Sequence, residues 1–95
     1  MQITLKTYSD LRKTIGKSEI DIDIDENSSL EDLISRLTKR YSEKFEREGG
    51  NNLREELNRN LNIYLKGRLI YPSKYSTTKL QDKDEITIMR PVGGG

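Results

Sequence analysis

Cysteine and histidine are absent from the 95 residues of this chain. Their absence excludes a disulfide scaffold, a zinc site built from Cys and His, a cysteine nucleophile and a histidine base. An enzyme would have to work with carboxylates, lysine, tyrosine or serine, and no carboxylate pair lies beside a candidate nucleophile. We therefore predict that the protein is not an enzyme, has no catalytic residues, and binds no metal or cofactor of its own. A protein of this composition could not carry sulfur on its own thiol.

An excess of charge and long apolar runs are also lacking. The 17 Lys and Arg residues are balanced by 16 Asp and Glu residues, for a net charge of +1, and the basic residues form no block. The sequence therefore gives no electrostatic reason to expect direct binding to nucleic acid or to a membrane surface. No apolar run approaches the length of a membrane span and no signal peptide opens the chain, so we expect a cytoplasmic protein.

Two stretches near the N-terminus alternate apolar and polar residues, which predicts strands. The alternating apolar positions are Ile3, Leu5, Ile20, Ile22 and Ile24. In the second strand they are interleaved with Asp21, Asp23 and Asp25. Gly16-Lys17 is interpreted as the turn of a hairpin between the two strands. The acidic row could bind a divalent cation, but a solvated face on an edge strand is favoured, because charge there discourages pairing with another molecule.

A long amphipathic helix is predicted to follow. Its apolar positions recur every three or four residues, at Leu30, Leu33, Ile34, Leu37, Tyr41 and Phe45. Ser28 is predicted to cap the helix, with Glu31 completing a capping box, and Gly49-Gly50 to end it. We expect one core between helix and sheet, shared by Leu33, Leu37, Ile22 and Ile63.

The second half of the chain predicts further strands. Residues 51–60 are polar, with Leu53 and Leu57 one helical turn apart, and are interpreted as a short helix or a partly ordered loop. Strands are predicted at residues 61–65 and 68–70, around a tight turn at Lys66-Gly67, and around residues 86–88. Two strands, a long helix and further strands indicate an α+β fold. One helix on one face of a mixed sheet of four to five strands is the β-grasp (ubiquitin-like) arrangement, although the pattern allows other small α+β topologies.

The sequence ends in Arg90, Pro91, Val92, Gly93, Gly94 and Gly95. Pro91 cannot donate to a β-ladder, so it is a natural place for the last strand to release the chain. Glycines without a Cβ can thread a slot too narrow for side chains. We predict a domain over residues 1–91 and a flexible tail over residues 92–95, with a frayed terminus as the alternative.

Four segments, in chain order, resemble those of one family. Residues 8–16 are similar to its aromatic-x-x-Leu-Arg-x-x-x-Gly stretch and residues 61–68 to its Val-Asn-Gly-Arg hairpin. Residues 80–86 resemble its Leu-x-Asp-Gly-Asp-x-Val approach to the last strand, and residues 89–94 its Pro-Pro-Val-x-Gly-Gly ending. The chain thus resembles the ubiquitin-like sulfur carriers: the small subunit of molybdopterin synthase, the thiamin sulfur carrier, and their archaeal and eukaryotic ubiquitin-related modifier relatives. It departs from them at two turn positions: Lys66 stands where the family often has asparagine, and Lys83 where it usually has glycine. It also ends on three glycines instead of two.

The resemblance implies a substrate of other enzymes. An E1-like enzyme would use ATP and Mg²⁺ to adenylate the carboxylate of Gly95, which would then become a thiocarboxylate or form an isopeptide bond with a lysine. Three outlets stay open: molybdopterin synthesis, tRNA thiolation and protein conjugation. The implied partners are the E1-like enzyme and, according to the outlet, the molybdopterin synthase large subunit, a tRNA thiolation enzyme, a JAMM-type protease or the lysines of modified proteins.

The resemblance also implies two recognition regions. The tail would be recognised through Pro91, Val92, Gly93 and Gly94. Partners would dock on the sheet face away from the helix, where the candidates are Tyr8, Tyr64 and Met89. These three are out of phase with the predicted core, and the alternative is that they pack at its margin. A non-covalent ubiquitin-like interaction module that uses only this face is the alternative function.

Overall fold

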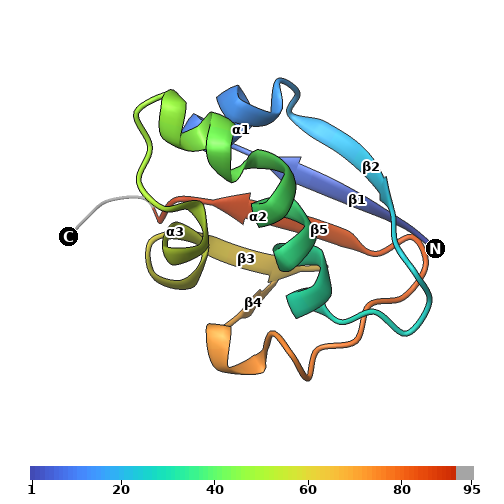
Figure 1. Ribbon diagram of the computed structural model, residues 1–95. Coiled ribbons are helices and arrows are strands. Elements are labelled where there is room, and N and C mark those ends of the chain that lie inside the picture. The colour runs from blue at the N-terminus through green and yellow to red at the C-terminus, as the bar shows by residue number, and fades with distance from the viewer. Residues whose placement is uncertain (92–95) are drawn as a thin grey trace.

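Five strands form a mixed sheet in the order β2-β1-β5-β3-β4 in the computed structural model, which describes residues 1–91 (Figure 1). The strands are β1 (Gln2–Thr7), β2 (Glu19–Asp23), β3 (Asn62–Leu65), β4 (Arg68–Ile70) and β5 (Glu85–Met89). β1 pairs antiparallel with β2 and parallel with β5, and β3 pairs antiparallel with both β5 and β4. The predicted mixed sheet is confirmed, with β2 at one edge.

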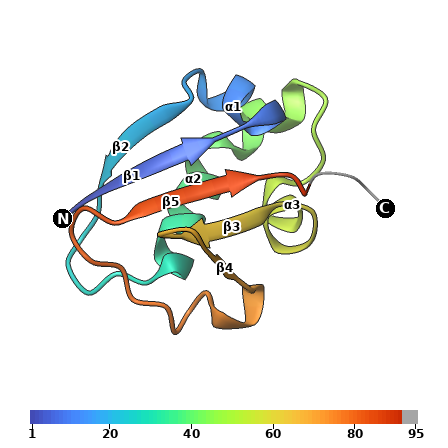
Figure 2. The same ribbon diagram turned by 180° about the vertical axis from the view of Figure 1, so that it is seen from behind.

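Three helices lie on one face of this sheet. They are α1 (Ser9–Ile15), α2 (Leu30–Arg47) and α3 (Leu53–Arg59), and a short 3-10 turn, η1 (Pro72–Lys74), follows β4. Seen from behind, the sheet lies in front of the helices and its other face is uncovered (Figure 2). The predicted β-grasp architecture, with one main helix packed on a mixed sheet, is confirmed. Of the helices in residues 1–91, none has the length and apolar character needed to cross a lipid bilayer.

The core lies between α2 and the sheet. Leu33, Leu37, Ile22 and Ile63 are all buried in it, as predicted from the apolar periodicity. The side chains that lose almost all solvent contact there include Ile3, Leu5, Leu30, Leu33, Ile34, Phe45, Leu53, Leu57, Ile63, Ile86 and Ile88. Tyr41, the fifth position of the predicted stripe, is only half-buried at the margin of this core.

The predicted cap of α2 is wrong by one residue. Ser29 is the N-cap, its hydroxyl accepting from the main-chain N–H of Asp32 at 3.2 Å, and Asp32 accepts in return from the N–H of Ser29 at 2.8 Å. Ser28 does not cap the helix because its hydroxyl donates to the carbonyl of Asp25 at 2.6 Å. Glu31 instead accepts a hydrogen bond from Arg54 of α3 at 2.6 Å. The helix ends at Arg47, just before the predicted glycines.

The predicted hairpin turn between β1 and β2 is also wrong. The two strands pair as expected, but α1 connects them, and Gly16 is the C-cap of this helix. Gly16 has φ +90°, and its N–H donates to the carbonyl of Arg12 at 2.8 Å. A glycine in the left-handed region suits the end of a helix as well as a hairpin turn, which is why the sequence alone did not separate the two.

The second half of the chain follows the prediction more closely. Residues 53–59 form the helix α3, one of the two structures expected there, with Asn52 as its cap. The turn between β3 and β4 places Lys66 at φ +52° and Gly67 at φ +81°. Lys83, before β5, has φ +70°. Both lysines that depart from the family pattern therefore adopt backbone conformations that asparagine or glycine would adopt at lower cost.

The acidic row lies where it was predicted, on an edge strand. Asp21 and Asp23 are exposed on β2, and Asp25 is exposed just beyond it. The hydroxyl of Thr4 on β1 donates to Asp21 at 3.1 Å. Within residues 1–91, no group of three or more acidic side chains is arranged to hold a metal ion.

Candidate functional site

The strand that leads to the tail lies in the middle of the sheet. β5 pairs with β1 on one side and with β3 on the other, so its end is held from both sides. Arg90 follows it directly, and Pro91 after it is exposed. Val92, Gly93, Gly94 and Gly95 lie outside the described residues, so the predictions that fall on them stay predictions. The geometry of the site is therefore that of the point from which the tail departs.

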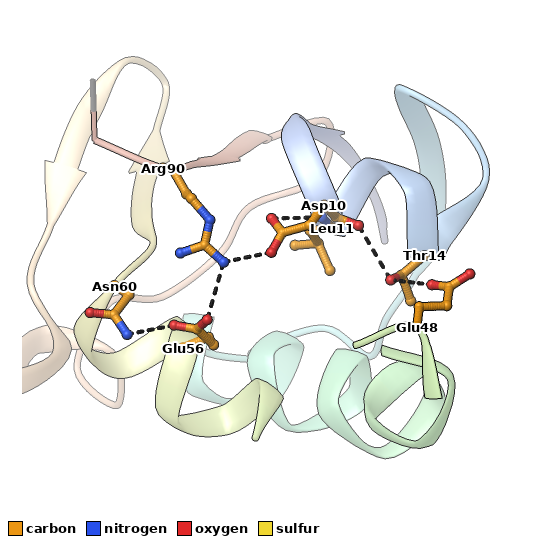
Figure 3. Close-up of polar contacts among 7 residues, drawn as sticks. All are labelled: Asp10, Leu11, Thr14, Glu48, Glu56, Asn60 and Arg90. Atoms are coloured by element: carbon orange, nitrogen blue, oxygen red, sulfur yellow. Dashed lines mark hydrogen bonds and ion pairs between the residues drawn. The ribbon is translucent and has the colours of Figure 1, made fainter. Parts of the chain in front are cut away.

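Arg90 joins three parts of the chain at this point (Figure 3). Its Nη2 donates to Asp10 Oδ2 on α1 at 2.5 Å and to Glu56 Oε1 on α3 at 3.1 Å. Glu56 is 5% exposed, and its other carboxylate oxygen accepts from Asn60 Nδ2 at 2.5 Å. A buried carboxylate is costly unless it is paired and hydrogen-bonded, and this one is both. The residue next to Pro91 is thereby tied to two helices.

The electrostatics beside Arg90 favour the charged form of Asp10. Partial burial alone raises the pKa of the Asp10 carboxyl, but the hydrogen bond and positive charge of Arg90 outweigh it, and the pKa lies below its ordinary value. The N–H of Leu11 also donates to Asp10, at 3.1 Å. Nearby, the hydroxyl of Thr14 donates to Glu48 at 2.7 Å and links α1 to the end of α2 (Figure 3).

The three residues predicted for docking lie on or beside the uncovered sheet face. Tyr64 and Met89 alternate with the buried Ile63 and Ile88, which places them on the side away from the helices, and both are half-buried. Tyr8 follows the last residue of β1 and is 44% exposed. The parallel register of β1 and β5 runs toward Tyr8 and Met89 together. The structure thus brings Tyr8 and Met89 to the end of the sheet that leads to Pro91, whereas Tyr64 lies opposite Thr87 in the middle of β5.

Sequence reasoning missed several residues of this site. Leu69 lies directly opposite Tyr64 on β4 and adds a half-buried apolar side chain to the same face. The tight turn between β3 and β4 fixes that pairing, so its register could have indicated Leu69. No comparable signal points to Arg90, Asp10 and Glu56, because the residues that meet are separated by 80 and 34 positions.

This arrangement can present a sheet face and the start of the C-terminal tail to a partner protein. A rigid sheet supplies a partly apolar face, and Arg90 fixes the start of a glycine-rich tail beside it. A face and a tail that leave from the same end of the sheet can be engaged by one partner at the same time.

Comparison with known proteins identifies the family. The ThiS family model matches residues 6–95, nearly the whole chain including the glycines. No curated protein matches the sequence well enough to count as a relative.

Solved structures share both the fold and the length. A putative molybdopterin converting factor, subunit 1, from Pyrococcus furiosus is 27% identical over 97% of this chain and 99% of that chain, with a TM-score of 0.71. The small archaeal modifier protein 1 of Methanosarcina acetivorans is 28% identical over 99% and 96%, with a TM-score of 0.70. In the complex of subunits 1 and 2 of the molybdopterin-converting factor from Helicobacter pylori 26695, the matching chain shares the fold at 21% identity, 100% coverage of both chains and a TM-score of 0.60. The chain belongs to the ThiS family, among the ubiquitin-like sulfur carriers and modifiers.

Proposed function

We propose that the chain is a carrier whose Gly95 carboxylate is activated by an E1-like adenylating enzyme. The observation that carries this proposal is the family match, which runs through the glycine tail to residue 95. The central position of β5 supports it, because a tail that leaves from a strand held on both sides starts at a defined place. In this proposal residues 1–91 are the domain that partners recognise, and residues 92–95 are the delivered arm.

The activation chemistry uses ATP and Mg²⁺ supplied to the partner. Adenylation makes the carbonyl carbon of Gly95 electrophilic, because AMP is a good leaving group. A persulfide of the partner that displaces AMP forms an acyl disulfide, and a second thiol of the partner then attacks the partner's sulfur of that S–S bond, forms a disulfide with it and releases the thiocarboxylate. A lysine amine that displaces AMP instead forms an isopeptide bond. The catalytic groups belong to the partner, and this chain contributes the carboxylate and the surfaces that bring it into place. Because such a partner needs ATP, we propose a cytoplasmic location for the protein.

Recognition would use the tail and the sheet face together. Pro91, Val92, Gly93 and Gly94 would fit a narrow channel, since the glycines carry no side chains. Tyr8, Tyr64 and Met89 would dock beside that channel. Subunit 1 of the Helicobacter pylori factor is found with subunit 2, which supports a molybdopterin synthase large subunit as one partner here. A tRNA thiolation enzyme, a JAMM-type protease and substrate lysines are the partners of the other outlets.

Intact mass spectrometry of the protein purified from its native cell tests this function. A gain of about 16 Da on the C-terminal peptide, from replacing one oxygen with sulfur, marks the thiocarboxylate. A branched peptide in which the C-terminal glycine is joined to a lysine marks conjugation. Finding neither form in cells that contain the adenylating enzyme would contradict the proposal.

The second candidate is a non-covalent interaction module. The uncovered sheet face with half-buried Tyr64, Leu69 and Met89 favours it, because such a face can bind a partner without any tail chemistry. The two candidates separate on removal of Gly94-Gly95. A module would keep its partners unchanged, whereas a carrier would lose its activation.

A further inference from the structure

The outer edge of β2 carries main-chain groups that are free to pair. β2 has only β1 beside it. Ile24 exchanges two hydrogen bonds with Met1, and the N–H of Thr7 donates to the carbonyl of Ser18, so the even-numbered residues of β2 face β1. In an antiparallel ladder the alternate residues then face outward, which are Glu19, Asp21 and Asp23. The open edge therefore offers their N–H and C=O groups.

One of these groups is already used by a side chain. Arg36 of α2 donates from Nη1 to the main-chain carbonyl of Asp23. This contact closes the edge at its Asp23 end. Among the residues that the structure describes, no other hydrogen bond from outside the sheet reaches the main chain of Glu19 or Asp21. A donor from outside β2 thus binds at this edge, and the adjoining positions are open to a strand.

A groove runs beside this edge, between β2 and α2. A depression of about 350 Å³ is lined by Ile20, Asp21, Ile22, Asp23, Arg36, Leu37, Arg40 and Tyr41. A second depression of about 410 Å³ shares Ile20, Asp21, Arg40 and Tyr41 with it and extends the groove to Ile15 and Lys17. The first depression has the buried Ile22 and Leu37 at its apolar floor. Its helix side carries guanidinium groups, with that of Arg40 lying 5.3 Å from the centre of the Tyr41 ring.

The charges around the groove select its occupant. A strand added to β2 would place alternate side chains beside Asp21 and Asp23, on the face away from α2. The intervening side chains would face the apolar floor and the arginines of α2. Lysine or arginine suits the first set, whereas apolar residues and one carboxylate suit the second. A second copy of β2 does not fit, because its own acidic row would lie directly opposite this one, and like charges there are destabilising.

We propose that the β2–α2 groove binds an extended peptide segment by antiparallel strand addition, and that this segment alternates basic with apolar residues and carries an acidic residue on its apolar side. Main-chain hydrogen bonds to Glu19 and Asp21 supply the pairing, and the floor of the groove supplies side-chain selectivity. The groove lies at the β2 edge of the sheet, with β1 between it and β5. The inference therefore does not rest on the carrier role.

The test uses the full chain, isotopically labelled, and the synthetic peptide acetyl-Lys-Val-Lys-Val-Lys-Glu-Lys-amide. Titration followed by amide chemical shifts should perturb β2 and the groove side of α2. The peptide acetyl-Lys-Lys-Lys-Val-Val-Glu-Lys-amide has the same composition with its second and fifth residues exchanged, which puts one lysine on the apolar side and one valine on the basic side, and it should bind at least roughly fivefold more weakly. Equal binding of the two peptides, or perturbations outside β2 and α2, would overturn the proposal.

Backbone methylation separates strand addition from simple charge attraction. N-methylation of the third and fifth residues, both lysine, removes the N–H groups that face β2 and should weaken binding at least roughly tenfold. N-methylation of the two valines, whose N–H groups face away, should leave binding nearly unchanged. Equal effects of the two modifications would overturn strand addition.

Charge-reversal variants of the protein test whether the peptide binds in the β2–α2 groove. Arg40→Glu and Asp21→Lys each reverse one charge of the groove and should weaken binding roughly fivefold. Lys39→Glu makes the same charge change on an exposed position of α2 outside the groove and is the matched control. Amide spectra of the free variants verify the fold. Binding that falls equally with the control variant would contradict the assignment to this groove.

Discussion

Arg90 ties the last described strand to two helices. Its guanidinium lies between Asp10, which is partly exposed, and Glu56, which is 7% exposed at its side chain. The ion pair between Arg90 and Asp10 is partly exposed and is screened by water, so most of the stabilisation comes from the ion pair between Arg90 and the buried Glu56. Arg90 thus compensates the charge of Glu56. The same contacts hold Arg90 in place immediately before Pro91.

Replacing Arg90 should therefore destabilise the fold. Arg90→Ala leaves Glu56 buried with Asn60 as its remaining side-chain partner, and we expect the free energy of unfolding to fall by about 1–3 kcal/mol. Urea unfolding of the two proteins measures this. Arg12→Ala removes an exposed guanidinium from α1 and should change stability by less than about 0.5 kcal/mol. Equal losses in the two variants would mean that the cluster stabilises nothing.

The ion pair of Asp10 should appear in the pH dependence of stability. The pKa of its carboxyl is lower in the folded protein than in the unfolded chain, where it is about 3.9. Its contribution is then fully present above about pH 5 and is lost as the pH falls through the folded pKa. Asp10→Asn lacks this titration, so the difference in unfolding free energy between the two proteins should shrink as the pH falls.

The control for this pH dependence is an acid without such a pair. The side chain of Asp23 is exposed and makes no ion pair within residues 1–91. Asp23→Asn removes a carboxylate without breaking an ion pair and is therefore the control variant. A constant gap between Asp10→Asn and the unchanged protein down to strongly acidic pH would contradict the proposed role of the pair.

The residues of the Arg90 ion-pair cluster could not be predicted from the sequence. Asp10 and Arg90 lie at opposite ends of the chain, and single charges in a chain with 35% charged residues carry no positional signal. Tyr64 and Met89 could be predicted, because strict alternation in a strand assigns each residue to one face. Local periodicity therefore identified the face, whereas the network at the tail depends on how three distant segments meet.

At the scale of elements, α2 organises the core. The capping box of Ser29 and Asp32 fixes its start, and its apolar stripe covers the sheet. Near its start it is joined to α3 by the ion pair between Glu31 and Arg54, at 2.6 Å. The helix is thus held by packing along its length and by polar contacts near its N-terminal end.

The stability cost of truncating Leu37 tests how α2 packs on the sheet. It is 3% exposed, so Leu37→Ala removes buried methyl groups and opens a cavity, at an expected cost of about 2–5 kcal/mol. Lys39→Ala, on the exposed side of the same helix, should cost less than about 0.5 kcal/mol. Thermal or urea unfolding gives both values. A cost below about 1 kcal/mol for Leu37→Ala would mean that α2 packs differently.

Long elements were predicted better than short ones for a physical reason. α2 has 18 residues and repeats its apolar positions over several turns, whereas α1 and α3 have 7 residues each and show at most two such positions. In α1 the terminal Gly16 also suits a hairpin turn. The box at the start of α2 was placed one residue early because Ser28 and Ser29 are both good caps, and only the contact of Ser28 with Asp25 decides between them.

At the scale of the molecule, part of the uncovered sheet face lies at the same end of the sheet as Pro91, from which the tail continues. Tyr8 and Met89 lie near the end of β5, where Pro91 is exposed. The parallel pairing of β1 with β5 creates this arrangement and joins the two ends of the chain. Periodicity cannot predict such a pairing: the order of the predicted elements indicated a mixed sheet of the β-grasp type but also allowed other small α+β topologies.

Substitutions on this face should affect docking and leave the tail chemistry intact. Tyr8→Ser and Tyr64→Ser together should raise the KM for this protein at least roughly fivefold in ATP–pyrophosphate exchange by its adenylating enzyme, with kcat nearly unchanged. The reason is that the carboxylate is still present once the complex forms. Lys39→Ser, on the helical face, is the control. A fall in kcat at constant KM would exclude a docking role for these tyrosines.

The most direct test of the carrier function is ATP–pyrophosphate exchange with and without the last two glycines. The adenylating enzyme should exchange pyrophosphate into ATP only when the full chain is present, because we propose the Gly95 carboxylate as the group that is adenylated. Deleting Gly94-Gly95 should abolish exchange while the melting temperature stays unchanged. The acyl carbon must lie beside the α-phosphate of ATP, and a shift of one residue moves it by about 3.3 Å. Undiminished exchange with the truncated protein would contradict the carrier function and favour the non-covalent interaction module.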